Sequence, residues 1–503
     1  MKKVFILIGG VIVLLVAMVL IAPGFIDWNA YKGEITRAAE TATGRRLSID
    51  GDLRFTVLPT PALRASGVRL SNIDGAQSPD MLTLKEVWIR VSIAELFRKR
   101  IAVESIQLVE PVITLEVLAD GRASWDLAIN LGGDDTKSGL KSTGDAGVAI
   151  SLASLTITKG VASYRKGAQL EHIENINVEI AAGSLNGPFT ATLSALVRGV
   201  PIEATLRPNT VRSNRPIDIN SAVAITGLKS RVLFSGKLVD PGPAALLKGK
   251  LTVEGENAAS AFQRLTGSVA PAVLAQPFSI VGVVSTDGKL TALNDMAMRL
   301  GDATANGAIN LNLGAAIDLD VALSVNKIEL EKFLPAEKTR EMTGKTIRSI
   351  PLKVVALNDA AFALPENINA SLDLTVDVLQ YNRGVVRQAG LRATMSNGSI
   401  TLDRASALLP GGSDVSAFGF LQMVDDAPLF EGEVAATSDN LRAVLDWLNI
   451  DTNGVSTDRL RGFSYASKVK ATLESVEIQD INIRLDASIM TGALALAIRE
   501  RPG

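Results

Sequence analysis

The sequence contains no cysteine and a single histidine, His172. Without cysteine the chain cannot form disulfides, use a thiolate nucleophile, or hold a thiolate-bound zinc ion or an iron–sulfur cluster. Several histidine ligands around one metal are excluded too, and a Ser-His-Asp triad would have to use His172. His172 stands between Glu171 and Ile173 in a region of strand-like alternation. A surface position in a strand is therefore favoured over a catalytic base.

The chain also has almost no net charge and few aromatic side chains. The 51 Lys and Arg and 53 Asp and Glu leave a net charge of −2, so the sequence lacks the basic surface that nucleic-acid binding requires. Aromatic residues make up 4% of the chain, whereas hydrophobic residues reach 47%. These are mainly Val, Ile, Leu and Ala, which favour extended strands over a compact aromatic core. The 503 residues suffice for several domains or for one long array.

No motif for catalysis, cofactor binding or metal binding stands out. The paired carboxylates Asp134 and Asp135 lie in a polar, glycine-rich segment, and Asp425 and Asp426 precede an Ala-Pro turn. The pair Gly9-Gly10 belongs to an apolar run, and no phosphate-binding loop occurs elsewhere. The sequence therefore predicts a protein that is not an enzyme and needs no cofactor.

An apolar segment near the N-terminus predicts a transmembrane anchor. Lys2 and Lys3 precede 23 uncharged residues, Val4–Ile26, which include Leu14 and Leu20. About 20 apolar residues cross a bilayer as a helix. The positive charges place the N-terminus in the cytoplasm and the rest of the chain outside it.

A cleaved signal peptide is the alternative interpretation of this segment. The candidate cleavage site follows Ala22. Leu20, two positions earlier, stands where cleavage sites have a small residue, and Pro23 comes directly after the site. We therefore expect the helix to remain attached.

A short amphipathic helix is expected directly after the anchor. Tyr31, Ile35 and three alanines recur at helical spacing with charged residues between them, and Gly44 follows as a stop signal. Such a helix would cap the first sheet; a position on the membrane surface is the alternative.

Beyond Gly44 the dominant period is two residues. Residues 317–325 alternate between apolar and polar or small side chains, and residues 372–378 do the same. Strands with one apolar and one polar face have this pattern, and antiparallel sheets commonly contain them.

A polar segment divides the expected domains. Residues 131–147 are too rich in glycine and polar side chains to pack, which indicates a flexible linker. The predicted organisation is an anchor over 1–26, a helix and first β unit over 27–130, the linker over 131–147, and repeated β modules over 148–503.

The repeated modules are predicted from glycines that we interpret as the first residues of apolar strands: Gly236, Gly307, Gly419 and Gly492. Short helical patterns follow the first three at residues 259–265, 330–334 and 441–448. Similar strands, beginning at Leu293, Leu402 and Ile478, precede three of the glycines. Chance alignment of short apolar strings is the alternative. The last module is incomplete, so the chain is either a fragment or ends in an open sheet edge.

Two groups of residues near the N-terminus carry a family resemblance. The first comprises Asp27, Trp28, Asn29, Tyr31, Lys32, Ile35, Thr43, Gly44, Arg45, Leu47, Ile49, Gly51, Asp52 and Leu53. The second comprises Arg90, Val91, Ser92, Leu96, Ile101, Ala102, Val103, Ile106, Leu108, Pro111, Leu115, Asp120, Gly121 and Trp125. Together they resemble the first β unit of the AsmA family, in detail over about 130 residues and in pattern beyond them.

The resemblance implies an inner-membrane protein of a double-membraned bacterium, with a periplasmic body of repeating β-groove type. It also implies a role in outer-membrane biogenesis and the carriage of phospholipid, without catalytic residues. The expected fold is mainly β: a transmembrane helix, then an extended, curled antiparallel β-sheet groove built of repeated modules with short capping helices.

An open groove would expose an apolar face that acyl chains could cover. The expected lining residues are Ile317, Leu319, Val321, Leu323, Leu372, Leu374, Val376 and Val378. A closed sandwich or stacked barrels, whose apolar faces bury each other, is the alternative fold. The alternative function is an assembly factor for outer-membrane proteins that binds partners through its sheet edges. The sequence leaves the lipid, the direction of transport, the energy source and the oligomeric state open.

Overall fold

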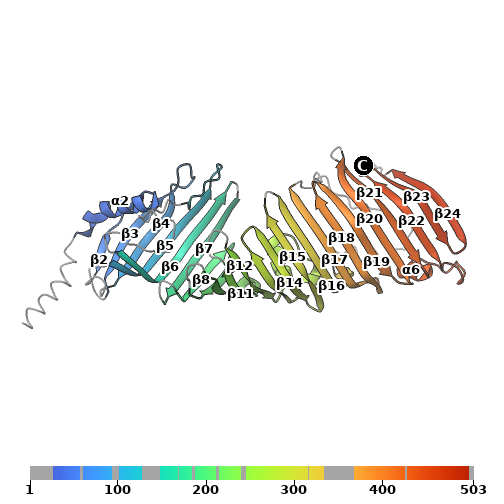
Figure 1. Ribbon diagram of the computed structural model, residues 1–503, viewed down its shortest axis with the longest axis horizontal. Coiled ribbons are helices and arrows are strands. Elements are labelled where there is room, and N and C mark those ends of the chain that lie inside the picture. Colours follow the sequence, from blue (N-terminus) through green and yellow to red (C-terminus); the bar gives the residue numbers. More distant parts are fainter. Residues whose placement is uncertain are drawn as a thin grey trace, which may run out of the picture. The chain divides into compact units, whose positions relative to one another are not determined.

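The computed structural model describes residues 27–56, 60–92, 101–126, 148–167, 169–183, 187–210, 215–239, 245–314, 316–333, 367–424 and 427–497. The chain forms two compact units that divide between Pro243 and Ala244, called unit 1 and unit 2 below. Figure 1 colours unit 1 from blue to green and unit 2 from green to red. The predicted anchor, with Val4, Leu14, Leu20 and Ile26, lies outside the described residues and stays a prediction. The described part of the chain contains no helix with the length and apolar character needed to span a bilayer.

Unit 1 is an open, mostly antiparallel sheet preceded by helices. The helices are η2 (Trp28–Tyr31) and α2 (Lys32–Thr43), and a short η3 (Thr226–Leu228) joins two later strands. The strands are β1 (Leu47–Ile49), β2 (Leu53–Thr56), β3 (Ala62–Ser71), β4 (Asp80–Val91), β5 (Ile101–Val117), β6 (Val148–Lys166), β7 (Gln169–Ala182), β8 (Phe189–Val197), β9 (Val200–Pro208), β10 (Ile217–Ile225) and β11 (Ser230–Val239). Both β1 and β2 pair with β3, and the later strands pair in chain order.

The expected helix after the anchor is present and ends where the sequence predicts. Gly44 has a φ of 67°, and its N–H donates to the Glu40 carbonyl oxygen at 2.8 Å. A residue with a side chain would be strained at this φ, which explains the glycine. Trp28 and Ile35 pack against a buried cluster of Leu53, Ala65, Val68 and Leu84, so the helical segment caps the first strands as expected.

The predicted linker, residues 131–147, lies outside the described residues, but the strands on either side of it are adjacent. β5 and β6 form a parallel pair in which Leu108 is the partner of Ile157. The segment therefore connects neighbouring strands of one unit. The division into compact units falls instead after Pro243, about 100 residues beyond the place that the sequence indicated.

Unit 2 has the same kind of open sheet. Its strands are β12 (Leu246–Gly255), β13 (Phe278–Thr286), β14 (Leu290–Leu300), β15 (Ala303–Leu313), β16 (Ile317–Glu329), β17 (Ile368–Tyr381), β18 (Gly384–Ser396), β19 (Ser399–Leu409), β20 (Ser413–Val424), β21 (Ala427–Ser438), β22 (Phe463–Ala471), β23 (Ser475–Leu485) and β24 (Ser488–Ala497). They pair in chain order, antiparallel except for the parallel pair β16–β17. Among the described residues the first and last strands, β12 and β24, do not pair with each other, so the sheet does not close.

The helical segments in the described part of unit 2 lie along one edge of its sheet. They are α4 (Ala258–Thr266), η4 (Ala272–Leu274), η5 (Leu330–Phe333) and α6 (Leu441–Trp447). α4, η5 and α6 lie where the sequence predicted helical patterns, whereas η4 was not predicted. α4, η5 and α6 follow β12, β16 and β21, and the pairing order makes these three strands end at the same edge. At that edge the Asn382 N–H donates to the Glu331 carboxylate at 2.6 Å, which ties η5 to the turn after β17.

The repeated segments that the sequence predicted from Leu293, Leu402 and Ile478 lie within β14, β19 and β23, and each contains a β-bulge. Leu293 of β14 is the partner of Ile309, and Met296 is the partner of Gly307. Three residues of β14 therefore span the same length as two residues of β15. The same shift separates Leu402 from Ala405, and Ile478 from Ile481. Asp295 and Asp480, the residues before Met296 and Ile481, have φ values of 50° and 52°. Bulges increase the local bend and twist, which favours a curled sheet.

The repeated glycines do not open strands, contrary to the expectation. Gly307, Gly419 and Gly492 lie inside β15, β20 and β24, each opposite the bulge of the preceding strand. Gly236 lies inside β11 without a bulge opposite it. A Cβ atom on Gly307 would lie 1.9 Å from the Ala322 carbonyl oxygen. The glycine therefore permits a close approach of two backbones at a bend.

Candidate functional site

The predicted lining residues of β16 and β17 share one face of the sheet. In the parallel pair, Val321 is the partner of Leu372 and Leu323 is the partner of Leu374. Leu319 and Val321 have Leu311 and Ile309 as partners on the other side. Because register partners point to the same side of a sheet, the two alternating segments contribute to a single apolar surface.

Val378 departs from this arrangement. Its partner in β18 is Arg387, whereas the partner of Leu379 is Val386, which is only 6% exposed. Gln388 has a φ of 49°, and the alternation of buried and exposed residues in β18 changes phase there. Val378 therefore shares its face with the exposed Arg387, and Leu379 continues the apolar face. Val376, 3% exposed, is the last predicted lining residue before this shift.

The apolar surface extends across every described strand of unit 2, from β12 to β24. One row of register partners, called the apolar row, follows the sheet from β12 to β24. It comprises Leu247, Thr286, Thr291, Leu311, Leu319, Ala370, Met395, Ile400, Leu421, Phe430, Ala471, Val476 and Leu496. None of these side chains is charged. Twelve strand spacings of about 4.8 Å make the row about 58 Å long.

The neighbouring row on the opposite face has a different character and is called the polar row. It comprises Lys248, Ser285, Ala292, Asn310, Asp320, Ser371, Thr394, Thr401, Phe420, Glu431, Lys470, Glu477 and Ala495. Polar side chains on this face form hydrogen bonds between strands. The Asp318 carboxylate accepts one from the Asn369 amide at 2.8 Å and one from the Asn312 amide at 3.1 Å. The two faces of the sheet are thus chemically distinct.

No second layer of the described chain covers the apolar row. Its members are half-buried, apart from Leu496, which is exposed. In the described part of unit 2 the buried hydrophobic residues are Met296, Ala305, Val376, Val386 and Val444. Tightly packed domains bury most of their apolar side chains, and this sheet does so at few positions. The closed sandwich, in which two apolar faces bury each other, is therefore not the arrangement of unit 2.

The beginning of unit 1 differs because its own helices cover the apolar face. Leu53 is 2% exposed beneath the helical segment, and the Trp28 ring lies 5.0 Å from that of Phe55. This cluster is the hydrophobic core of the first four strands. The uncovered apolar face therefore belongs to the later strands.

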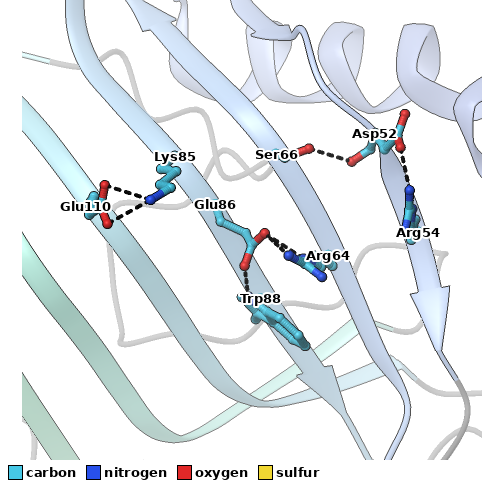
Figure 2. A network of polar contacts seen from close by, with 8 residues as sticks. All are labelled: Asp52, Arg54, Arg64, Ser66, Lys85, Glu86, Trp88 and Glu110. Atoms are coloured by element: carbon cyan, nitrogen blue, oxygen red, sulfur yellow. Dashed lines mark hydrogen bonds and ion pairs between the residues drawn. The ribbon is translucent and has the colours of Figure 1, made fainter.

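The opposite face of these first strands carries a network of charges, shown in Figure 2. The Arg64 guanidinium donates to Glu86 at 2.6 Å and lies 4.7 Å from the centre of the Trp88 ring. The Trp88 indole N–H also donates to Glu86, and Lys85 pairs with Glu110 at 2.9 Å. Burial disfavours ionisation of Glu86, but these hydrogen bonds and the nearby positive charges outweigh it, so its pKa lies below the ordinary value.

Sequence reasoning found the apolar face where alternation is uninterrupted and missed it at the bulged strands. Met296 and Met298 belong to this face, but Asn294 and Asp295 break the period before them. The signal that could have found them is the shared pattern of an apolar residue, two polar residues and a second apolar residue, at 293–296 and 478–481.

The fold and its face define a class of protein: a long, open, curled β-sheet with an apolar surface that the described chain leaves uncovered. Comparison with protein families assigns the chain within this class. The family model of the AsmA family matches residues 1–330, and the chain belongs to that family. No curated protein and no solved structure matches the chain.

Proposed function

We propose that the protein is a lipid carrier that holds phospholipid acyl chains on the apolar face of its sheet. The observation that carries the proposal is the apolar row of unit 2, an uncharged surface about 58 Å long without a covering layer. Family membership and the open sheet support a role in lipid transport or envelope biogenesis.

The free energy available is sufficient for binding. Apolar surface removed from water contributes about 25 cal/mol per Å², and an acyl chain of about 16 carbons contributes on the order of 10 kcal/mol. The side chains of the row are mostly aliphatic, with two threonines and Phe430 among them, so successive positions hold a chain with similar free energy. A lipid could then move along the face without being trapped, while its headgroup stays in water.

In this proposal the protein is anchored in the bacterial inner membrane by residues 4–26, with a cytoplasmic N-terminus and a periplasmic body. It moves phospholipid between the inner and outer membranes and performs no chemical reaction. The alternative, an assembly factor that binds outer-membrane proteins through sheet edges, requires no bound lipid.

Mass spectrometry of the protein purified in mild detergent tests the proposal. We expect co-purified phospholipid, and we expect Leu372→Glu to reduce it several-fold because a charge would lie on the apolar face. The matched control is Ser371→Glu, the adjacent position on the polar face, which should leave the lipid content unchanged. Circular dichroism establishes that both variants keep their strand content. A folded wild-type protein without phospholipid, or equal losses in the two variants, would contradict the proposal and favour the assembly factor.

A further inference from the structure

Two phenylalanines interrupt the polar face of unit 2. Phe418 and Phe420 of β20 are 51% and 37% exposed, and they lie on the face that carries the polar row. The cross-strand neighbours of Phe420 are Thr401 and Glu431. Single exposed apolar residues are common on protein surfaces, but two aromatic rings on successive outward positions of one strand form a patch.

The two rings border a depression, called the outer hollow. Its volume is about 700 Å³, which is within the usual size of ligand pockets. Gly419 and Gly432, which are register partners, line it with backbone atoms alone, and their Cβ positions face the apolar side near the Phe430 ring. The remaining lining residues are Thr401, Leu402, Asp403, Glu431, Glu433, Lys468, Val469, Lys470 and Gln479.

Two carboxylates that line the outer hollow, Asp403 and Glu433, form no hydrogen bond or ion pair with another described residue. Lys470 pairs with Glu431 at 3.0 Å, and Lys468 pairs with Asp480 at 2.9 Å. Glu433 is the register partner of both Phe418 and Lys468. After the hydrogen bond and the charge of Asp480, the charge of Glu433 also raises the pKa of Lys468, although no hydrogen bond or ion pair joins Glu433 to another described residue. A negative charge thus stands next to an exposed aromatic ring at the rim of a cavity.

We propose that the outer hollow binds the cationic side chain of an arginine or lysine from a partner protein. A guanidinium over the Phe418 ring gains a cation–π interaction and pairs with the Glu433 carboxylate. Phe420 packs against the aliphatic part of the same side chain or its neighbour. Aromatic residues and arginine are the commonest energetic centres of protein interfaces, and this combination fits that chemistry.

A protein partner fits this position better than a lipid headgroup. The sheet separates the outer hollow from the apolar row, so a lipid with its chains on the apolar face cannot place its amine beside Glu433. On the outer face, Asp414, Ser416 and Gln422 share β20 with the two rings, so an acyl chain would meet polar side chains. The inference does not depend on the proposed lipid transport.

Peptide binding tests the inference with the purified full chain. The probe is a fluorescein-labelled heptapeptide, Gly-Ser-Leu-Arg-Leu-Ser-Gly, followed by fluorescence anisotropy. Its matched control replaces arginine by citrulline, which has nearly the same shape without the charge. We expect the arginine peptide to bind at least fivefold more tightly than the citrulline peptide. The variant Glu433→Gln should remove this difference, and Phe418→Ser should weaken arginine binding about two- to fivefold.

A variant at another carboxylate of the same face distinguishes binding in the outer hollow from general attraction between opposite charges. Asp377→Asn removes one negative charge from β17, outside the outer hollow, and should leave the preference for arginine intact. Equal binding of the two peptides, or equal effects of the variants at 433 and 377, would overturn the proposal. So would binding of short-chain phosphatidylethanolamine that Glu433→Gln abolishes, because it would assign the cation to a lipid.

Discussion

The Trp447 indole N–H donates a hydrogen bond to the Tyr381 carbonyl oxygen at 2.8 Å, and the two rings meet edge to face with centres 6.2 Å apart. Trp447 ends α6, and Tyr381 ends β17, which lies 66 residues earlier in the chain. This contact holds α6 against the turn between β17 and β18. The helix-lined edge of unit 2 is therefore attached to the sheet by a specific tertiary interaction.

We expect Trp447→Ala to loosen this edge without unfolding the sheet. The substitution removes a hydrogen bond worth about 1 kcal/mol and an aromatic pair worth about 0.5–1.5 kcal/mol. Hydrogen exchange at residues 441–447 should accelerate, while exchange in β20 stays slow. Trp447→Phe, which keeps a ring and loses the donor, should give an intermediate rate. Unchanged exchange in α6 would show that the contact does not hold the helix.

The repeated glycines should differ in their tolerance of a side chain. Gly307→Ala places a Cβ atom against the Ala322 carbonyl oxygen, and relief of that clash should cost about 1–3 kcal/mol of the free energy of unfolding. Gly492 occupies the equivalent position opposite a bulge, but nothing lies within 4 Å of its Cβ position. Gly492→Ala should therefore be nearly neutral. Chemical denaturation of the two variants measures the difference, and equal destabilisation would contradict the role assigned to Gly307.

Glu86 should make the stability of unit 1 depend on pH. Because the folded pKa of Glu86 lies below its ordinary value, the carboxylate stabilises the folded state above the unfolded pKa, about 4.3. This contribution is lost as the pH falls through the folded pKa. Glu86→Gln should lower stability at neutral pH and lose less of it on acidification. Thermal unfolding followed between pH 7 and pH 3 tests this, and identical pH profiles would contradict it.

Asp486 holds a loop through its carboxylate. It accepts backbone hydrogen bonds from Leu460 and Arg461 at 2.9 Å and from Gly462 at 3.1 Å. The bond from Leu460, then those from Arg461 and Gly462, outweigh desolvation and lower the pKa of Asp486. Asp486→Asn should speed hydrogen exchange at residues 460–462 at neutral pH. In the wild type, the same amides should lose protection only when acid protonates Asp486, below its ordinary pKa. Equal exchange in both proteins at neutral pH would show that the Asp486 carboxylate does not hold this loop.

Alternation in residues 317–325 and 372–378 and the helical pattern at 441–448 are local properties of the chain, and they predicted the β class, the apolar side chains and the short helices. Which strands meet is not local. Val321 and Leu372 lie 51 residues apart, and only the hydrogen bonds between β16 and β17 place them on one surface. The phase shift beside Met296 also arises from pairing, because a bulge inserts a residue in β14 and not in β15. The shift at Val378 lies beside a bulge between β18 and β19, where Arg387 and Gly390 are the partners of Leu408 and Ser406. The sequence by itself therefore determined the composition of each face, whereas tertiary pairing decided the continuity of that face and left it uncovered.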